Sequence, residues 1–238
     1  MQALAWGLVL LVIGSVHPGA SRAGPAPSER CPAAAVLALV PPPPGVGAGQ
    51  VPDASASTQG DYRHRLSGTA HGWPRRDSWC VWVEPAQAEG PAAHWDQAWL
   101  EAVDKALASW AELVPIERVH DPEQAQVRIL RRRPPLRGGR ASHGRADLQL
   151  AVVNRDGRRQ LEPRVVVQIS PGQRASAMQA TALHELGHAF GLWGHSEAAG
   201  DAMAAVPEAS PVLELSPRDR ATFLWLQQQP GLGPAPTP

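Results

Sequence analysis

A chain of 238 residues is long enough for one or two domains. Its 22 lysines and arginines balance its 22 aspartates and glutamates, so the formal net charge is zero. This balance argues against nucleic acid, and against an acidic membrane surface, as the partner of the protein.

The N-terminal segment, residues 1–23, is typical of a secretory signal peptide. Residues 4–16 form an almost uninterrupted apolar run, and Ala20 and Ala23 offer small residues for cleavage. The run is shorter than the ~20 residues that span a bilayer, so we expect no stable membrane insertion. The first residues carry no lysine or arginine, which leaves an uncleaved anchor as the alternative. We therefore expect an exported protein, either secreted or periplasmic.

Residues 24–72 are rich in proline, alanine, glycine and serine, and they predict a linker or a short pro-segment. One apolar patch, residues 33–40, interrupts this composition. The two cysteines of the chain are Cys31 and Cys80, and in an exported protein we expect a disulfide between them. Free thiols are the alternative.

A folded domain is predicted over residues 73–230, followed by a disordered tail over residues 231–238. Apolar residues recur at three- and four-residue spacing between Trp95 and Trp110, which predicts an amphipathic helix that Pro115 ends. A polar loop is predicted over residues 131–146. Short β-rich runs bounded by turn residues predict strands at 79–83, 116–119, 127–130, 148–153 and 165–169.

Two further helices are predicted towards the C-terminus. Ser176 and Gln179 have the spacing of a capping box that opens a helix over residues 177–189. Ser216 followed by Pro217 predicts the start of a last helix, which runs to about Leu226. This order of strands and helices predicts an α+β fold.

The most specific motif lies on the first of these two helices. His184 and His188 are four residues apart, which places both imidazoles on one face of a helix, with Glu185 beside them. Gly191 lets the chain leave the helix and turn back, because glycine adopts positive φ without penalty. His195 then supplies a third nitrogen. Three imidazoles and an adjacent carboxylate predict a Zn²⁺ site that keeps one position open for water.

These residues resemble the motif of the metzincin metallopeptidases, and within them the bacterial matrixin-like branch. In the family pattern the third histidine follows the glycine by three residues, where this chain has Gly194, and His195 comes one residue later. Gly194 is suited to absorb the extra residue, as a bulge or a positive-φ residue. The residues that match the pattern position for position are His184, Glu185, His188 and Gly191.

The resemblance extends to Met203, eight residues after His195, which resembles the methionine turn that forms an apolar floor under the metal. It implies a twisted, mixed five-stranded sheet with two helices, and a small lower subdomain that carries the methionine turn and the C-terminal helix. It also implies an extended substrate along an edge strand, for which residues 148–153 are the candidate.

The function that the resemblance implies is an exported zinc-dependent endopeptidase. Glu185 takes a proton from water, and His184, His188 and His195 bind Zn²⁺. We expect a polypeptide substrate and a monomeric protein. The resemblance also offers a third alternative for Cys31, because matrixin propeptides can carry an Arg-Cys segment whose thiolate occupies the zinc.

Other functions stay open at this point. A gluzincin-type zinc hydrolase would replace His195 by a downstream carboxylate such as Glu208 or Glu214. A non-catalytic zinc-binding interaction module could keep the same fold, although a purely structural site does not need Glu185. A zinc hydrolase acting on non-peptide amides is a further alternative.

Overall fold

The structure is a computed structural model that describes residues 30–40, 60–87, 89–90, 92–136, 142–155, 157–206 and 209–236. The expected signal peptide, residues 1–23, lies outside the described residues. Within the described ranges, no helix has both the length and the apolar character that a membrane span requires.

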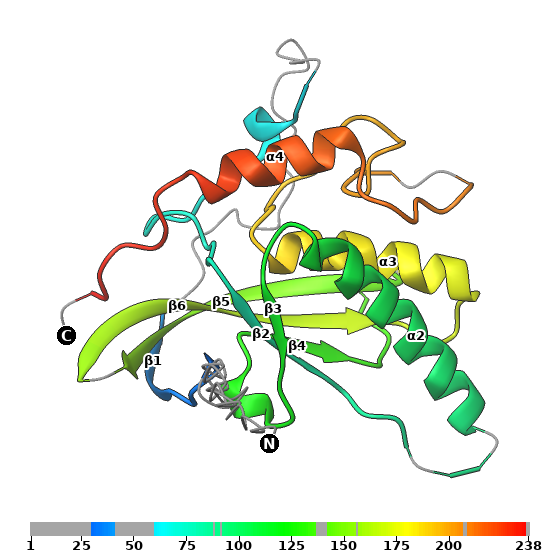
Figure 1. Cartoon of the computed structure of the whole chain (residues 1–238), viewed down its shortest axis with the longest axis horizontal. Coiled ribbons are helices and arrows are strands. Elements are labelled where there is room, and N and C mark those ends of the chain that lie inside the picture. Colours follow the sequence, from blue (N-terminus) through cyan, green and yellow to red (C-terminus); the bar gives the residue numbers. More distant parts are fainter. Residues whose placement is uncertain are drawn as a thin grey trace, which may run out of the picture.

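The core of the fold is a mixed six-stranded sheet with the strand order β1-β5-β6-β4-β2-β3 (Figure 1). β5 is antiparallel to both of its neighbours, whereas the β6-β4-β2-β3 half is parallel. The predicted α+β class is confirmed, but the predicted number of five strands is wrong, because the apolar patch assigned to the linker adds β1. The strands are β1 (Ala35–Val40), β2 (Trp79–Val83), β3 (Ile116–Arg118), β4 (Val127–Leu130), β5 (Gly144–Arg155) and β6 (Arg158–Ile169).

The described residues also form three α-helices: α2 (Ala92–Ala111), α3 (Ala175–Ala189) and α4 (Pro217–Gln227). α2 and α3 lie on the same face of the sheet, and α4 lies farther out (Figure 1). Two short 3₁₀ turns, η1 (Arg63–Arg65) and η2 (Pro122–Gln124), connect elements.

The tryptophans of α2 belong to the core between the helices and the sheet. Trp99 and Trp110 are wholly buried. The indole N–H of Trp99 donates to the carbonyl of Ile169 at 3.2 Å, and that of Trp110 donates to the carbonyl of Leu183 at 3.0 Å. These two side chains fix α2 against β6 and α3 without leaving a buried indole N–H unsatisfied, because each of these donors has an acceptor.

The two predicted helix starts have different outcomes. Ser216 opens α4 as predicted, since its hydroxyl accepts from the Asp219 N–H at 3.0 Å in a complete capping box. The capping box predicted at Ser176 is wrong, because α3 begins at Ala175 after Arg174 and has no side-chain cap. The Gln179 amide donates instead to the carbonyl of Leu213 at 3.2 Å.

Segments outside the predicted domain also belong to the packed structure. Tyr62 is wholly buried, and its N–H donates to the Thr222 hydroxyl on α4 at 3.0 Å, so the domain begins before residue 73. Leu232 forms a bridge with Gly72, and Pro234 forms a bridge with Gln160. Residues 231–236 therefore pair with the domain, which corrects the expectation of a disordered tail there.

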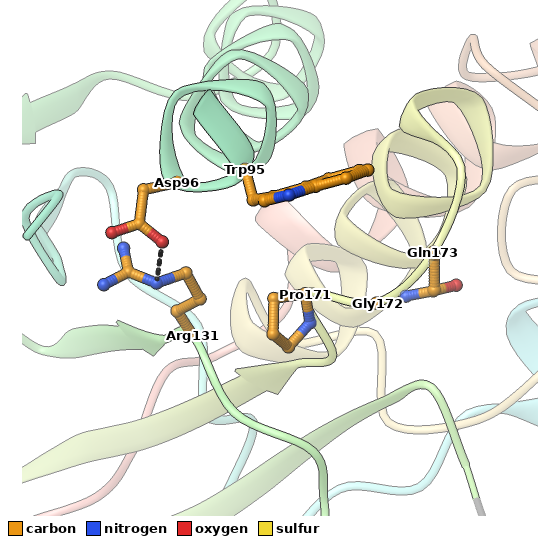
Figure 2. Close-up of a pocket in the computed structure, with 6 residues that line it drawn as sticks. All are labelled: Trp95, Asp96, Arg131, Pro171, Gly172 and Gln173. Carbon is orange, nitrogen blue, oxygen red and sulfur yellow. Dashed lines mark ion pairs between the residues drawn. The ribbon is translucent and has the colours of Figure 1, made fainter. Parts of the chain in front are cut away.

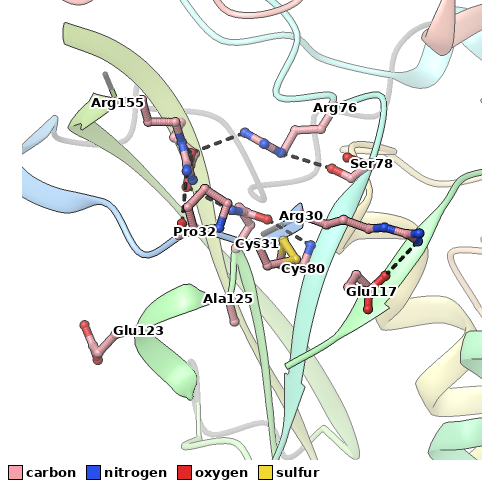
Figure 3. The surroundings of a disulfide bond; sticks show 12 residues. Arg30, Cys31, Pro32, Arg76, Ser78, Cys80, Glu117, Glu123, Ala125 and Arg155 are labelled. Atoms are coloured by element: carbon pink, nitrogen blue, oxygen red, sulfur yellow. Dashed lines mark hydrogen bonds and ion pairs between the residues drawn. A yellow bond between two sulfur atoms is a disulfide. The ribbon is translucent and has the colours of Figure 1, made fainter. Parts of the chain in front are cut away.

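A disulfide joins the N-terminal segment to the sheet. Cys31 and Cys80 are bonded, with an S–S distance of 2.05 Å, and Cys80 lies in β2 (Figure 3). The Arg155 guanidinium donates to the carbonyl of Pro32 at 3.0 Å and holds the same segment against β5. With Cys31 bonded to Cys80, its sulfur is neither a free thiol nor a zinc-blocking thiolate.

Candidate metal centre

Three imidazole rings meet beside the C-terminal half of α3. His184 and His188 lie one helical turn apart, and His195 comes from the segment that follows the helix. One ligand atom from each of the three lies within 4.8 Å of the other two. Among the described residues, this is the only group of three or more His, Cys, Asp or Glu side chains that could hold a metal ion. Glu214 is exposed and is not part of it, and Glu208 lies outside the described residues.

Backbone carbonyls fix the orientation of two of the rings. The Nδ1 of His184 lies 2.8 Å from the carbonyl of Ala202, and the Nδ1 of His188 lies 2.7 Å from the carbonyl of Leu192. A carbonyl oxygen only accepts, so each Nδ1 carries the proton and each Nε2 is left with a lone pair. This is the tautomer in which Nε2 can bind a metal.

The spacing of the ring nitrogens suits a tetrahedral ion. The Nε2 atoms of His188 and His195 are 3.2 Å apart. Two nitrogens that bind one tetrahedral zinc at about 2.05 Å would lie about 3.3 Å apart. The three histidines could therefore hold a metal ion, and the separation of this pair is the one that a tetrahedral zinc would require.

Burial keeps the three histidines neutral. It lowers the pKa of His184 to about 4, with a further lowering from His195. Burial also lowers the pKa of His188 and the pKa of His195. Neutral imidazole is the form that binds a metal, so the site is prepared for a cation near neutral pH.

The turn after α3 brings His195 back to the helix. Gly191 has a φ of 112°, its N–H donates to the carbonyl of His188, and the next N–H, of Leu192, donates to the carbonyl of Gly187. These two bonds form the Schellman arrangement that ends many helices. The positive φ expected as one option for Gly194 is absent. Gly194 is required by close packing instead, since a Cβ there would lie 2.1 Å from the carbonyl oxygen of Arg65.

Met203 is wholly buried and packs against α3, the helix that carries His184 and His188. A Cβ added at Gly187 would lie 2.2 Å from the Met203 sulfur, so the helix approaches this methionine through a glycine placed between the two helical histidines. The Met203 carbonyl accepts from the Ser196 N–H at 2.8 Å, which joins the turn to the residue after His195. Gly187 could not be predicted from the sequence, because no neighbouring residue indicates that a distant side chain requires glycine at this position of the helix.

A buried carboxylate on α4 supports this turn. Asp219 accepts from the Ala202 N–H at 2.8 Å, from the Ser216 N–H at 2.9 Å and from the Tyr62 hydroxyl at 2.7 Å. Ala202 in turn holds the His184 ring through its carbonyl. Sequence analysis missed Asp219, although its spacing three residues after Ser216 is that of a capping box.

Glu185 is buried and faces the start of β5. A Cβ added at Gly144 would lie 2.4 Å from the Thr181 methyl group and 2.7 Å from a Glu185 carboxylate oxygen, so a larger residue there would displace these side chains. Burial raises the pKa of Glu185 to about 8, and a backbone hydrogen bond from Ala146 opposes this rise. A cation beside the carboxylate would lower the pKa again. The affinity of Glu185 for a proton would therefore respond to a positive charge placed beside it.

The strand edge nearest Glu185 differs from the edge expected for a substrate. Residues 148–153 were the expected edge, but β1 pairs with β5 from Leu150 to Asn154. This expectation is wrong for the paired residues, because the N-terminal segment already occupies their outer edge. No described residue pairs with the outer edge of β5 from Gly144 to Gln149.

A hollow of about 400 Å³ lies at the N-terminal ends of α2 and α3 (Figure 2). Its charged groups are engaged with each other, since the Arg131 guanidinium lies 3.0 Å from the Asp96 carboxylate. α3 rises by about 14 Å between Ala175, just after the hollow, and His184, so this hollow is separate from the histidine cluster. It is lined by Trp95, Asp96, Arg131, Pro171, Gly172 and Gln173.

Sequence comparisons give no match to a known protein family and no significant match to a curated protein. The functional assignment therefore depends on the geometry of the three histidines, Glu185 and the neighbouring edge of β5.

Proposed function

We propose that the protein is an exported zinc-dependent endopeptidase of the metzincin type. The observation that carries this proposal is the convergence of three neutral imidazoles next to a buried Glu185, beside a strand edge with which no described residue pairs. His184, His188 and His195 would hold the zinc, and Met203 would form the apolar floor below it.

The chemistry divides between the metal and the protein. Zinc supplies Lewis acidity, which lowers the pKa of water towards neutrality and polarises a substrate carbonyl. Glu185 accepts the proton of the attacking water and later delivers it to the leaving amine. The Glu185 side chain lies beside Gly144 at the start of β5.

A polypeptide substrate fits the free part of the β5 edge. An extended peptide can add to an exposed edge as a further strand, and main-chain hydrogen bonds then supply much of its affinity. Such binding would place a peptide bond beside Glu185, because the edge at Gly144 directly adjoins this side chain. A substrate bound in this way must be unstructured at the site of cleavage.

The test is a Glu185→Gln variant of the mature protein, with Glu214→Gln as the matched control at an exposed carboxylate. We expect Glu185→Gln to keep one equivalent of zinc and to lose about 10²- to 10⁴-fold in the hydrolysis of unfolded casein. We expect Glu214→Gln to match the parent in both measurements. Activity of Glu185→Gln within a few-fold of the parent would reject the role of this residue.

The same experiment separates the rival functions. A parent protein that binds zinc but cleaves neither casein nor a peptide library would be a zinc-binding interaction module. A coordination sphere of two imidazoles and one carboxylate in the X-ray absorption spectrum would favour the gluzincin alternative. Three imidazoles are expected.

A further inference from the structure

The outer edge of β5 consists of two halves. In the C-terminal half of β5, β1 pairs antiparallel with it, from Ala35 opposite Asn154 to Val40 opposite Leu150. In the other half, Gly144 to Gln149, β5 pairs with β6 on its inner side, and no described residue pairs with its outer side. A peptide that binds this edge must therefore share it with β1.

The free half adjoins Glu185. The Ser170 N–H donates to the carbonyl of His143 at 2.8 Å. Hydrogen-bonded pairs alternate along an antiparallel ladder, so the odd-numbered residues of β5 form the hydrogen bonds with β6. The even-numbered residues Gly144, Ala146 and Leu148 then turn their backbone groups outward. The Glu185 carboxylate lies beside Gly144, where an added Cβ would meet its oxygen at 2.7 Å, and near the Ala146 backbone. We therefore place the carboxylate at the level of Gly144 to Ala146.

The direction of β1 decides which side of a substrate meets it. A peptide that pairs antiparallel with β5 runs in the same direction as β1, so its N-terminal end faces Val40. From Ala146 to Leu150 the strand advances by about 13 Å, which is the length of about four extended residues. Beyond that distance the edge is occupied.

We propose that β1 closes the substrate edge on its N-terminal side, and that the enzyme pairs with no more than about four residues before the scissile bond. This inference rests on the proposed peptidase function. It assigns a substrate class: short peptides and flexible terminal segments, in place of long extended stretches of polypeptide. In a longer substrate, the residues further towards the N-terminus must bend away from the sheet, and they form no further backbone hydrogen bonds with β5.

β1 is held firmly enough to act as such a stop. The disulfide between Cys31 and Cys80 fixes its N-terminal end to β2, and the Arg155 side chain binds the carbonyl of Pro32 (Figure 3). A substrate would have to displace five register pairs between the strands to gain the same edge. The covalent anchor keeps β1 in reach after each displacement, which favours the closed edge.

The test is a series of zinc-enzyme assays on peptides with a constant C-terminal side and two to eight residues before the scissile bond. For the parent protein we expect kcat/KM to rise up to about four residues and to change less than twofold from four to eight. The perturbed variant is Ala38→Pro in the full chain. Ala38 lies opposite Val152, directly after a register irregularity between Val36 and Ala38. Because Val152 is even-numbered, we expect the Ala38 N–H to point towards β5, and proline would remove that donor.

The matched control is Leu39→Pro. Leu39 lies opposite Ala151, so its N–H points away from β5, and its side chain is 58% exposed. For Ala38→Pro we expect at least a fivefold gain in kcat/KM between four and eight residues, whereas Leu39→Pro should keep the plateau of the parent. A parent rate that rises steadily to eight residues, or an Ala38→Pro plateau equal to that of the parent, would overturn the proposal.

A binding measurement keeps the inference separate from the catalytic assignment. Fluorescence anisotropy of the same peptides, labelled at the C-terminus, is measured on the Glu185→Gln protein with zinc. A plateau in affinity at about four residues, lost in the Ala38→Pro background, supports the closed edge even if no peptide is hydrolysed. Absence of hydrolysis alone rejects the proposed function, and absence of a plateau in binding rejects the role of β1.

Discussion

Gly194→Ala tests whether close backbone packing positions the third histidine. A Cβ at this position would lie 2.1 Å from the carbonyl oxygen of Arg65 and 3.0 Å from the Cα of Leu66. These neighbours are backbone atoms, so no side-chain rotation relieves the overlap, and the two segments must separate by about 1 Å to reach an ordinary contact distance of about 3 Å or more. His195 is the next residue and moves with the segment.

A displacement of this size exceeds the ±0.2 Å or so within which metal–ligand distances are held. We therefore expect Gly194→Ala to lower zinc affinity about 10- to 100-fold, and to destabilise the metal-free protein by about 1–3 kcal/mol. Zinc affinity is measured by competition with a chromophoric chelator, and stability by urea denaturation.

Gly200→Ala is the matched control in the same loop, because no atom lies within 4 Å of its added Cβ. It should leave zinc affinity within threefold of the parent. If Gly194→Ala also binds zinc within threefold of the parent, the packing against Arg65 does not position His195.

Two further predictions concern buried carboxylates. Burial alone would raise the pKa of Glu162, but the guanidinium groups of Arg76, Arg164 and Arg155 outweigh it and hold the pKa below the usual 4.5. Glu162→Gln should cost about 2–3 kcal/mol at pH 7. A depressed pKa stabilises the fold above the unfolded value, so urea denaturation should show this difference shrinking as the pH falls below about 4.5. Asp219→Ala removes the acceptor of four donors, the Tyr62 hydroxyl and the N–H groups of Ala202, Met203 and Ser216. It should cost about 3 kcal/mol or more, whereas Tyr62→Phe, in the same assay, should cost about 1 kcal/mol. Equal losses for these last two variants would contradict the shared role of Asp219.

The sequence predicted those parts of the molecule that local spacing determines. The four-residue interval between His184 and His188 sets their common face, and Gly191 sets the turn that returns the chain to them. β2, β4 and α2 follow from runs of apolar residues with the period of a strand or a helix. In each case the residues that decide the structure lie within one or two turns of each other.

The start of β5 shows why strand lengths were underestimated. Gly144 to Asp147 has the polar composition of a loop, yet the Arg145 guanidinium donates to the Asp147 carboxylate two residues along the same strand, at 2.8 Å. Polar side chains on the exposed face of a strand satisfy one another, and the sequence alone does not separate this arrangement from a loop.

Contacts between distant segments account for most of the remainder. The apolar patch of β1 pairs only because the outer edge of β5 is free to receive it, 110 or more residues later in the chain. Tyr62 likewise finds Asp219 at a separation of 157 residues. Neither segment has a periodic pattern of its own, so its burial depends on partners that local sequence does not reveal.

These distant contacts end at the metal centre. The Tyr62 hydroxyl binds Asp219, Asp219 holds the backbone of Ala202, and the carbonyl of Ala202 orients the ring of His184. A second N-terminal contact, of Arg65 with Gly194, sets the position of His195. Ligand geometry is only as accurate as the groups that hold each ligand. The segment before residue 73 therefore belongs to the candidate metal centre, because its contacts reach two of the three histidines, His184 through Asp219 and Ala202 and His195 through Gly194.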